Sequence, residues 1–126
     1  MMNERNTIVP VKFISLMRRP AHLTYEQFVD YHRNSHANTF MADPTVQRLC
    51  RKYIQSHTIP SGLDGFPAST FDGVTELWFD TLEDFDHVFT SATYNAIIRP
   101  DEHKFVDLPN SEVLLVVENP VWNPTN

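Results

Sequence analysis

Two segments of the chain carry the signature of a helix start, and each is flanked by apolar runs typical of strands. Thr24 is followed three residues later by Gln27, which is the spacing of a capping box. Thr81 is followed at the same spacing by Asp84, and acidic residues in a first turn suit the positive end of the helix dipole. The sequence therefore predicts helices over residues 24–37 and 81–98.

Four apolar runs predict strands, because β-branched and aromatic residues alternate in them with other residues. These runs cover residues 8–17, 46–59, 74–80 and 111–119. The stretch 60–73, between the second and third runs, is rich in glycine and proline and predicts a loop. Residues 99–110 read as a loop or a short helical piece.

The order of these elements is β-α-β-β-α-β, which predicts an α+β fold of the ferredoxin-like sandwich type. We expect a single domain over residues 1–126, with a core of about 9–119 and an irregular tail over 120–126. Because both helices would cover one face of a four-stranded sheet, the other face needs cover. A second copy of the chain would supply it, so we expect a homodimer.

Charge and composition exclude several classes of partner. The chain has 10 Lys and Arg against 16 Asp and Glu, a formal net charge of -6, whereas nucleic acid and anionic membranes need a basic surface. Cys50 is the only cysteine, which fits a reducing compartment. No apolar run approaches the roughly 18 residues of a membrane span, and the polar start is not a signal peptide. We therefore expect a cytoplasmic protein that binds neither nucleic acid nor membrane.

Residues 11–37, VKFISLMRRPAHLTYEQFVDYHRNSHA, resemble the opening of the EthD-like family of dimeric α+β barrel proteins. In that family, a strand ending in basic residues and proline leads to a T/S-x-E-x-F helix that closes on a His-Ala pair, here His36 and Ala37. Later stretches resemble the family's second strand, its third strand and second helix, and its closing segment: residues 51–57, 71–85 and 101–119.

The resemblance implies a cofactor-free pocket between sheet and helices, lined by aromatic and apolar side chains. The family is linked to ether-degradation operons, polyketide dehydratases or cyclases, and isomerases of the muconolactone type. Related barrels include cofactor-free monooxygenases of phenolic polyketides. Isomerase relatives keep a histidine at the helix end and a tyrosine on the second strand, which correspond to His36 and Tyr53. The position of their pocket cysteine is Leu77 in this chain.

His36 is the first catalytic candidate, because imidazole titrates near neutral pH and moves a proton in either direction. The alternative is a helix-end histidine that bonds the last carbonyls. His32, one helical turn earlier, is interpreted as a packing or substrate-contacting residue. A metal site formed by the two histidines would need a third ligand. The intervening residues Arg33, Asn34 and Ser35 offer no carboxylate, so we expect no metal.

Tyr53 and His57 share one face of the predicted second strand, about 13 Å apart, and are the other catalytic candidates. Tyr53 would donate a hydrogen bond to a carbonyl or enolate oxygen, unless it is a core aromatic whose hydroxyl is satisfied by a neighbour. His57 precedes Pro60 near the strand end and is either a second proton-moving group or a rim residue.

The remaining candidates would bind the substrate. Trp78, Phe79 and Phe89 are expected in the core and pocket walls, and Asp72 is either a polar contact there or a turn residue in an ion pair. No glycine-rich phosphate loop, nucleophile elbow or CxxC motif is present, so nucleotide cofactors and covalent serine chemistry are unsupported.

These residues predict a cofactor-free lyase (dehydratase or cyclase) or isomerase that acts on a small aromatic, polyketide-like or lactone substrate by His-mediated proton transfer. Two alternatives remain open. One is a cofactor-independent monooxygenase of phenolic substrates, and the other is a non-catalytic accessory protein that binds a small molecule.

Overall fold

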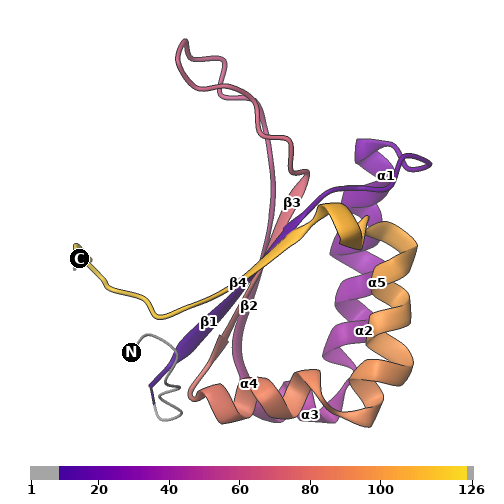
Figure 1. The fold of residues 1–126 in the computed structure, drawn as a ribbon, viewed down its shortest axis with the longest axis vertical. Coiled ribbons are helices and arrows are strands. Elements are labelled where there is room, and N and C mark those ends of the chain that lie inside the picture. Colours follow the sequence, from indigo (N-terminus) through magenta and orange to yellow (C-terminus); the bar gives the residue numbers. More distant parts are fainter. Residues whose placement is uncertain (1–8, 125–126) are drawn as a thin grey trace.

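Four strands form one antiparallel sheet in the order β2-β3-β1-β4 in the computed structural model, which describes residues 9–124 (Figure 1). The strands are β1 (Val11–Met17), β2 (Cys50–His57), β3 (Gly73–Phe79) and β4 (Glu112–Val116). The central strands pair from Val11 with Phe79 to Met17 with Gly73. The predicted ferredoxin-like α+β fold is confirmed. Residue 8, where the predicted first strand begins, lies outside the described residues.

Both predicted helices begin at their threonines. Thr24 Oγ1 accepts a hydrogen bond from Gln27 N at 3.1 Å, and Gln27 Oε1 accepts one from Thr24 N at 2.8 Å, which completes the capping box. Thr81 Oγ1 accepts a hydrogen bond from Asp84 N at 3.0 Å. Because the side chains satisfy amide groups that the helix itself leaves unpaired, the chain enters both helices at fixed residues.

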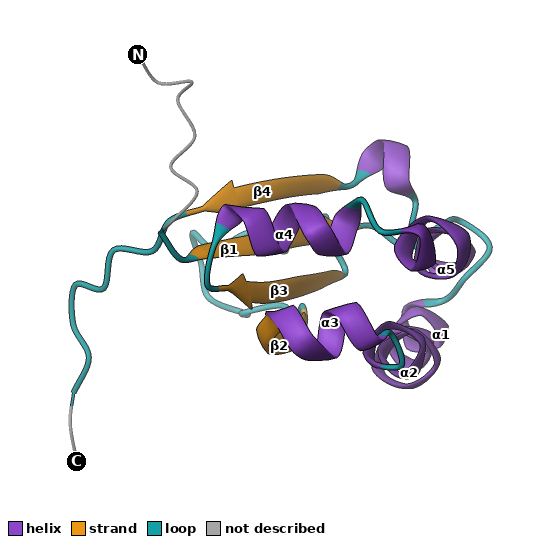
Figure 2. Cartoon of the chain, turned by 90° about the horizontal axis from the view of Figure 1, so that it is seen from below, coloured by secondary structure: helices purple, strands orange, loops and turns teal. Residues whose placement is uncertain are grey.

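Each helical segment contains a stretch of wider π-helix. The first runs through α1 (Tyr25–Asp30), the π-helix η1 (Tyr31–His36) and α2 (Ala37–Met41). The second begins with α4 (Leu82–Phe89) and continues after a turn through the π-helix η2 (Tyr94–Ile98), α5 (Arg99–Phe105) and the 3-10 turn η3 (Leu108–Asn110). Figures 1 and 2 show these helices on one side of the sheet.

Two boundaries differ from the sequence prediction. The strand predicted from Val46 begins only at Cys50, because α3 (Pro44–Leu49) precedes it. The side chain of Asp43 caps this helix by accepting a hydrogen bond from Thr45 N at 2.8 Å, and Pro44 suits its first turn. The stretch left as a loop or short helical piece contains α5, while the helix predicted over 81–98 is interrupted after Phe89.

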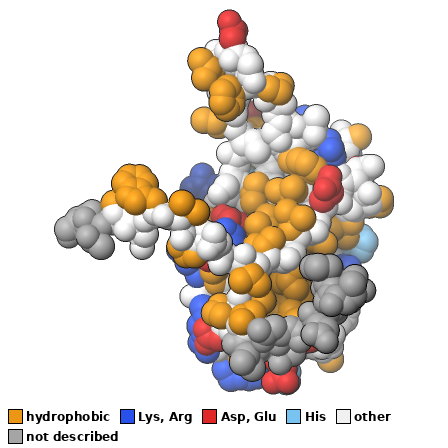
Figure 3. All heavy atoms as spheres, turned by 60° about the vertical axis from the view of Figure 1, so that its left-hand side comes forward, with side chains coloured by type: hydrophobic (Ala, Val, Ile, Leu, Met, Phe, Trp, Pro, Cys, Tyr) orange, Lys and Arg blue, Asp and Glu red, His pale blue; other side chains and the backbone are white. Residues whose placement is uncertain are grey.

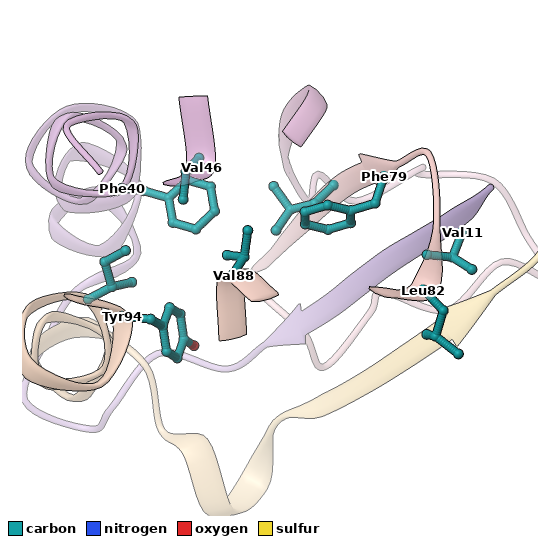
Figure 4. Close-up of a cluster of buried hydrophobic side chains, with 9 residues drawn as sticks. Val11, Phe40, Val46, Phe79, Leu82, Val88 and Tyr94 are labelled. Carbon is teal, nitrogen blue, oxygen red and sulfur yellow. The ribbon is translucent and has the colours of Figure 1, made fainter. Parts of the chain in front are cut away.

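Two apolar clusters fill the space between sheet and helices. The larger consists of Val11, Phe40, Val46, Leu77, Phe79, Leu82, Val88, Tyr94 and Ile98 (Figure 4). The smaller consists of Met17, Phe28, Phe105 and Val106. Close packing is evident at Gly73 in β3, where an added Cβ would lie only 2.8 Å from Phe28 Cε2.

The other face of the sheet, here called the open face, carries the alternate side chains of the strands, including Lys12, Ile14, Ile54, Trp78 and Leu114. No helix of residues 9–124 covers it, and hydrophobic side chains gather on this side of the molecule (Figures 1 and 3). Ile54 is 38% exposed and Leu114 is 44% exposed. The sheet therefore has one face buried under helices and one that is partly apolar and accessible.

Candidate functional site

A cavity of about 440 Å³ lies between the helix-covered face of the sheet and the helices. Its walls combine side chains from β1, β2, β3 and β4 with side chains from the helical segments. Much of the wall is aromatic or aliphatic, and its aromatic rings come from Phe13, Phe40, Tyr53, Phe85, Phe89, Tyr94 and Phe105. A cavity of this size and lining suits a small, largely apolar molecule with a few polar groups.

His36 lies in this cavity wall at the end of η1 and is only 7% exposed. Its Nδ1 is 2.8 Å from Asp101 Oδ2, a carboxylate supplied by α5 and 6% exposed. The other carboxylate oxygen, Oδ1, accepts a hydrogen bond from Tyr31 at 2.5 Å. Asp101 thus joins the two helical segments and holds the imidazole at a fixed angle.

The pairing of His36 with Asp101 decides which ring nitrogen can act. Carboxylate oxygens only accept hydrogen bonds, so the Nδ1 of His36 carries the proton that binds Asp101. This leaves Nε2, which no residue of the described chain binds, for a molecule in the cavity. A histidine oriented by a carboxylate is a common arrangement for a general base.

The sequence did not predict a role for Asp101, although its segment, 101–119, is one of those that resemble the family. Asp101 lies 65 residues from His36, and only the packing of α5 against η1 brings the two together. Its one local signal was an acidic residue in the first turn of a short helix, which ordinarily indicates a favourable helix-dipole interaction rather than a site.

A second polar group in the wall consists of Tyr94, Arg99 and Glu102, none of which was predicted from the sequence as a site residue. Glu102 Oε2 accepts a hydrogen bond from Tyr94 at 2.6 Å, and Glu102 Oε1 lies 3.0 Å from Arg99 Nε. Arg99 Nη2 donates to the Tyr94 hydroxyl at 3.2 Å. Burial raises the pKa of Glu102, and the bond from Tyr94 opposes that rise. The group places a charged pair and a hydroxyl along a wall that is largely apolar.

Tyr53 lies in the cavity wall on β2, as the sequence predicts. Its hydroxyl accepts a hydrogen bond from Gln55 Nε2 at 2.7 Å, and the same nitrogen donates to the backbone carbonyl of His32 at 2.7 Å. Burial raises the pKa of Tyr53 to about 12, so the hydroxyl keeps its proton at neutral pH. Because Gln55 occupies an acceptor position, the Tyr53 proton is available to a ligand oxygen.

His32 and His57 lie beside the cavity rather than in its wall. His32 is fully buried, and its ring nitrogens lie 2.9 Å from His57 Nε2 and 2.9 Å from Thr75 Oγ1. Burial above all, with His57 and His36 as neighbours, lowers the pKa of His32 to about 3. The sequence left both residues open, His32 as a packing or substrate-contacting residue and His57 as a proton-moving group or a rim residue. Neither lines the cavity, because each turns a ring nitrogen to the other. Among the described residues, no group of three His, Cys, Asp or Glu side chains is placed to hold a metal.

The remaining residues that were predicted to line the cavity lie in different parts of the structure. Phe89 lines the cavity, whereas Phe79 is 1% exposed and packs in the larger apolar cluster. Trp78 belongs to the open face, where its Nε1 donates to Glu118 Oε1 at 3.0 Å, so it cannot be a wall of this cavity. Asp72 also lies away from the cavity and pairs with Arg19 Nη1 at 2.6 Å. Of the two interpretations of Asp72, a polar contact in the cavity or a turn residue in an ion pair, these contacts agree with the second.

Solved structures with the same fold include an EthD-family protein and a protein of unknown function. An EthD-family protein from Bacillus halodurans C-125 superposes with a TM-score of 0.67 and 21% identity, covering 88% of this chain and 100% of its own. A dimeric protein of unknown function with a ferredoxin-like fold, from Bacteroides fragilis, has a TM-score of 0.62 and 17% identity, with coverages of 88% and 98%.

Two further structures with this fold are enzymes. SnoaB, a cofactor-independent oxygenase from Streptomyces nogalater, has a TM-score of 0.59 and 11% identity, covering 90% of this chain and 96% of its own. The hydroxynitrile lyase of Passiflora edulis has a TM-score of 0.56 and 15% identity, with coverages of 92% and 99%. At these identities the likeness establishes the fold alone.

Sequence comparison adds the family. No curated protein sequence matches the chain. Residues 9–124 contain no helix with the length and apolar character needed to cross a membrane. The model of the EthD domain matches residues 20–109, a range that contains η1 with His36, the Tyr53 strand and α5 with Asp101. The chain therefore belongs to the EthD domain family.

Proposed function

We propose that the protein is a cofactor-free lyase or isomerase of a small aromatic, polyketide-like or lactone molecule. The observation that carries the proposal is the His36–Asp101 pair in an aromatic cavity, with Nδ1 held at 2.8 Å and Nε2 left to the cavity. An imidazole in this state accepts a proton at Nε2, and the adjacent carboxylate stabilises the imidazolium that forms.

The reaction proposed is proton transfer at a carbon next to a carbonyl group. His36 Nε2 takes the proton, and the Tyr53 hydroxyl donates a hydrogen bond to the enolate oxygen that develops. Returning the proton to a different carbon gives an isomerase, whereas expelling a leaving group such as hydroxide, protonated by the imidazolium, gives a dehydratase. The phenyl rings of the wall lower the local polarity around the enolate, which strengthens both interactions.

The group of Tyr94, Arg99 and Glu102 is assigned the polar end of the substrate. Arg99 uses Nε for Glu102 and Nη2 for Tyr94, and no described residue binds its Nη1. An Arg Nη1 carries two N–H donors, which suit a carbonyl, phenolate or carboxylate oxygen. A substrate held there by a polar end would lie with its apolar body against the phenyl rings of the wall.

The proposal is tested by His36→Gln, whose amide still donates to Asp101 but cannot take up a proton. Turnover of a responsive quinone, anthrone or lactone, followed by absorbance, should fall at least ~100-fold. His103→Gln is the matched control, because His103 is an exposed histidine on α5 outside the cavity wall, and it should keep full turnover. Equal turnover in His36→Gln and the control would reject His36 as the proton-moving group.

Tyr53→Phe tests the second role. Because the hydroxyl would act on the enolate rather than on the ground state, its loss should lower kcat more than it weakens substrate binding. A weaker affinity with unchanged kcat would assign Tyr53 to binding alone.

A cofactor-independent oxygenase of phenolic substrates is the second candidate, and the aromatic cavity together with the fold shared with SnoaB supports it. Oxygen consumption separates the two, because a lyase or isomerase consumes none. Saturable ligand binding with no product from any substrate in the panel would instead support an accessory binding protein.

We also propose that the open face is the interface of a homodimer, which the partly apolar exposure of Ile54 and Leu114 and the dimeric ferredoxin-like relative support. Ile54→Glu with Leu114→Glu should halve the mass measured by light scattering. Leu63→Glu, in the exposed loop between β2 and β3, is the control and should leave the mass unchanged. A wild-type protein with the mass of one chain would refute the proposal.

A further inference from the structure

Three polar side chains form a continuous hydrogen-bonded chain beside the cavity. His32 occupies the middle, with His57 Nε2 2.9 Å from its Nδ1 and Thr75 Oγ1 2.9 Å from its Nε2. Thr75 lines the cavity from β3, whereas His57 is the last residue of β2 and is only half-buried. The three side chains therefore connect the cavity wall with the outer end of the sheet.

The middle residue is enclosed on every side. His32 is fully buried, and the rings of Phe28 and Phe105 lie 5.8 Å and 5.6 Å from its own. Its low pKa keeps the ring neutral at neutral pH. A neutral imidazole has one donor and one acceptor nitrogen, so it passes a proton by accepting one at one nitrogen while it releases one from the other.

The two ends differ in what faces them. The Thr75 hydroxyl has Met17 Sδ at 3.9 Å as its other neighbour, a weak acceptor that leaves the hydroxyl proton available to His32 or to a molecule in the cavity. His57 faces His32, the ring of Phe28 and the charge of Arg33. Burial lowers the pKa of His57, and Arg33 lowers it further, so His57 releases a proton to water readily.

We propose that His57, His32 and Thr75 form a proton relay between the cavity and the solvent at the end of β2. The relay rests on the proposed function, because a reaction that takes a proton from one side of a substrate and returns one from the other needs a second path for proton exchange. Thr75 is the member that touches the cavity, and the two histidines are positioning residues that act through it.

A proton that leaves the cavity moves the protons of the relay by one hydrogen bond each. A molecule in the cavity gives a proton to Thr75 Oγ1 while the hydroxyl gives its own proton to His32 Nε2. The proton on His32 Nδ1 passes to His57 Nε2, and His57 releases one proton from Nδ1 to water. One proton leaves the cavity and none accumulates. The reverse sequence returns a proton and restores both imidazoles to their starting tautomers.

The relay adds a second proton route to the one at His36. His36 enters the cavity from a helix, whereas Thr75 enters it from the sheet, where it pairs with Ser15 of β1. A proton taken from one face of a flat substrate can therefore be returned from the other face. That arrangement suits an isomerase or dehydratase in which the two protonation sites are on opposite faces.

Exchange of the His32 ring proton with solvent tests the relay without any substrate. Protein labelled with 15N-histidine gives this rate by NMR. His57→Gln keeps a hydrogen-bonding side chain but cannot be protonated, and Thr75→Val keeps the shape but loses the hydroxyl. Each should slow the exchange at least about tenfold, because the proton then leaves only by local opening of the fold. Thr75→Ser keeps the hydroxyl and should exchange at the wild-type rate.

The outcomes separate the relay from a purely structural cluster and from the proposed function. A packing role for His57 predicts equal or faster exchange in His57→Gln, because water enters the gap, and that result would overturn the relay. Equal exchange in Thr75→Val and wild type would also overturn it, since the path would then end before the cavity. His36→Gln should lower turnover at least ~100-fold and leave the exchange rate unchanged, so failure of the catalytic proposal shows in a different measurement.

Discussion

Replacing Asp101 by Asn tests whether the carboxylate controls the chemistry of His36. Asp101 is 6% exposed, and its carboxylate accepts hydrogen bonds from the Tyr31 hydroxyl at 2.5 Å and from His36 Nδ1 at 2.8 Å. An amide offers only one acceptor oxygen, so its NH₂ group must face one of the two donors. If it faces His36, the imidazole must turn its lone pair to the amide and carry its proton on Nε2.

The magnitude follows from the two bonds. Hydrogen bonds to a charged group contribute about 1.5–3 kcal/mol and neutral ones about 0.5–1.5 kcal/mol, so exchanging two charged bonds for neutral ones should cost roughly 2 kcal/mol of unfolding free energy. The change of tautomer removes the base from the cavity. Turnover should therefore fall at least ~100-fold, a loss much larger than the small fraction of unfolded protein can explain.

The assay combines urea unfolding, turnover and 15N NMR of the imidazole, which distinguishes the two tautomers. Lys104→Gln is the control, because Lys104 lies 3.8 Å from the same carboxylate but its side chain is 67% exposed, and it should change stability by less than about 1 kcal/mol. If Asp101→Asn keeps the Nδ1 proton on His36 and retains turnover, the carboxylate is only a structural link between η1 and α5.

Three further predictions concern stability. Thr24→Ala removes one half of the capping box and should cost about 1 kcal/mol in urea unfolding, whereas an unchanged midpoint would mean that tertiary packing alone fixes the helix start. Gly73→Ala places a methyl group 2.8 Å from the fully buried Phe28 ring and should cost about 1–3 kcal/mol by overpacking; a neutral effect would show that the ring can move. The folded pKa of His32 is about 3 against an ordinary 6.5, so the unfolded chain binds the proton first as pH falls. Stability should be fully present above about pH 6.5 and decline toward pH 3, by at most about 1.4 kcal/mol per pH unit from this group. His32→Gln should flatten that part of the pH profile, and an unchanged slope would assign the decline to other groups.

Local sequence signals predicted the starts of the helices, because the hydrogen bonds at Thr24 and Thr81 join residues three apart. They failed at α3, where alternating apolar residues suggested a strand although Asp43 and Pro44 supplied a cap and a first turn. The cap at Asp43 is a signal of a few residues, whereas the alternating apolar pattern is longer and favoured a strand. Val46 is buried, which agrees with the periodicity of a helix as well as that of a strand.

Local sequence signals predicted only part of the candidate site. His36 and Tyr53, both predicted site residues, line the cavity, but Asp101 becomes the partner of His36 only through packing of distant segments. Trp78 was assigned to the cavity with Phe79, although adjacent strand residues point to opposite faces. His32 and His57 were identified as unusual, but a sequence cannot show that their nitrogens bind each other rather than a substrate.

The π-helical turns have a consequence for how the cavity is kept in evolution. Each of η1 and η2 holds more residues per turn than a regular helix. Deleting one residue of η1, for example Asn34, would close it into regular helix, so that His36 and Phe40 would keep nearly their present directions. The same deletion in a regular helix would rotate all that follows by about 100°. Related chains with a one-residue gap within η1 should therefore keep both the fold and the pair of His36 and Asp101.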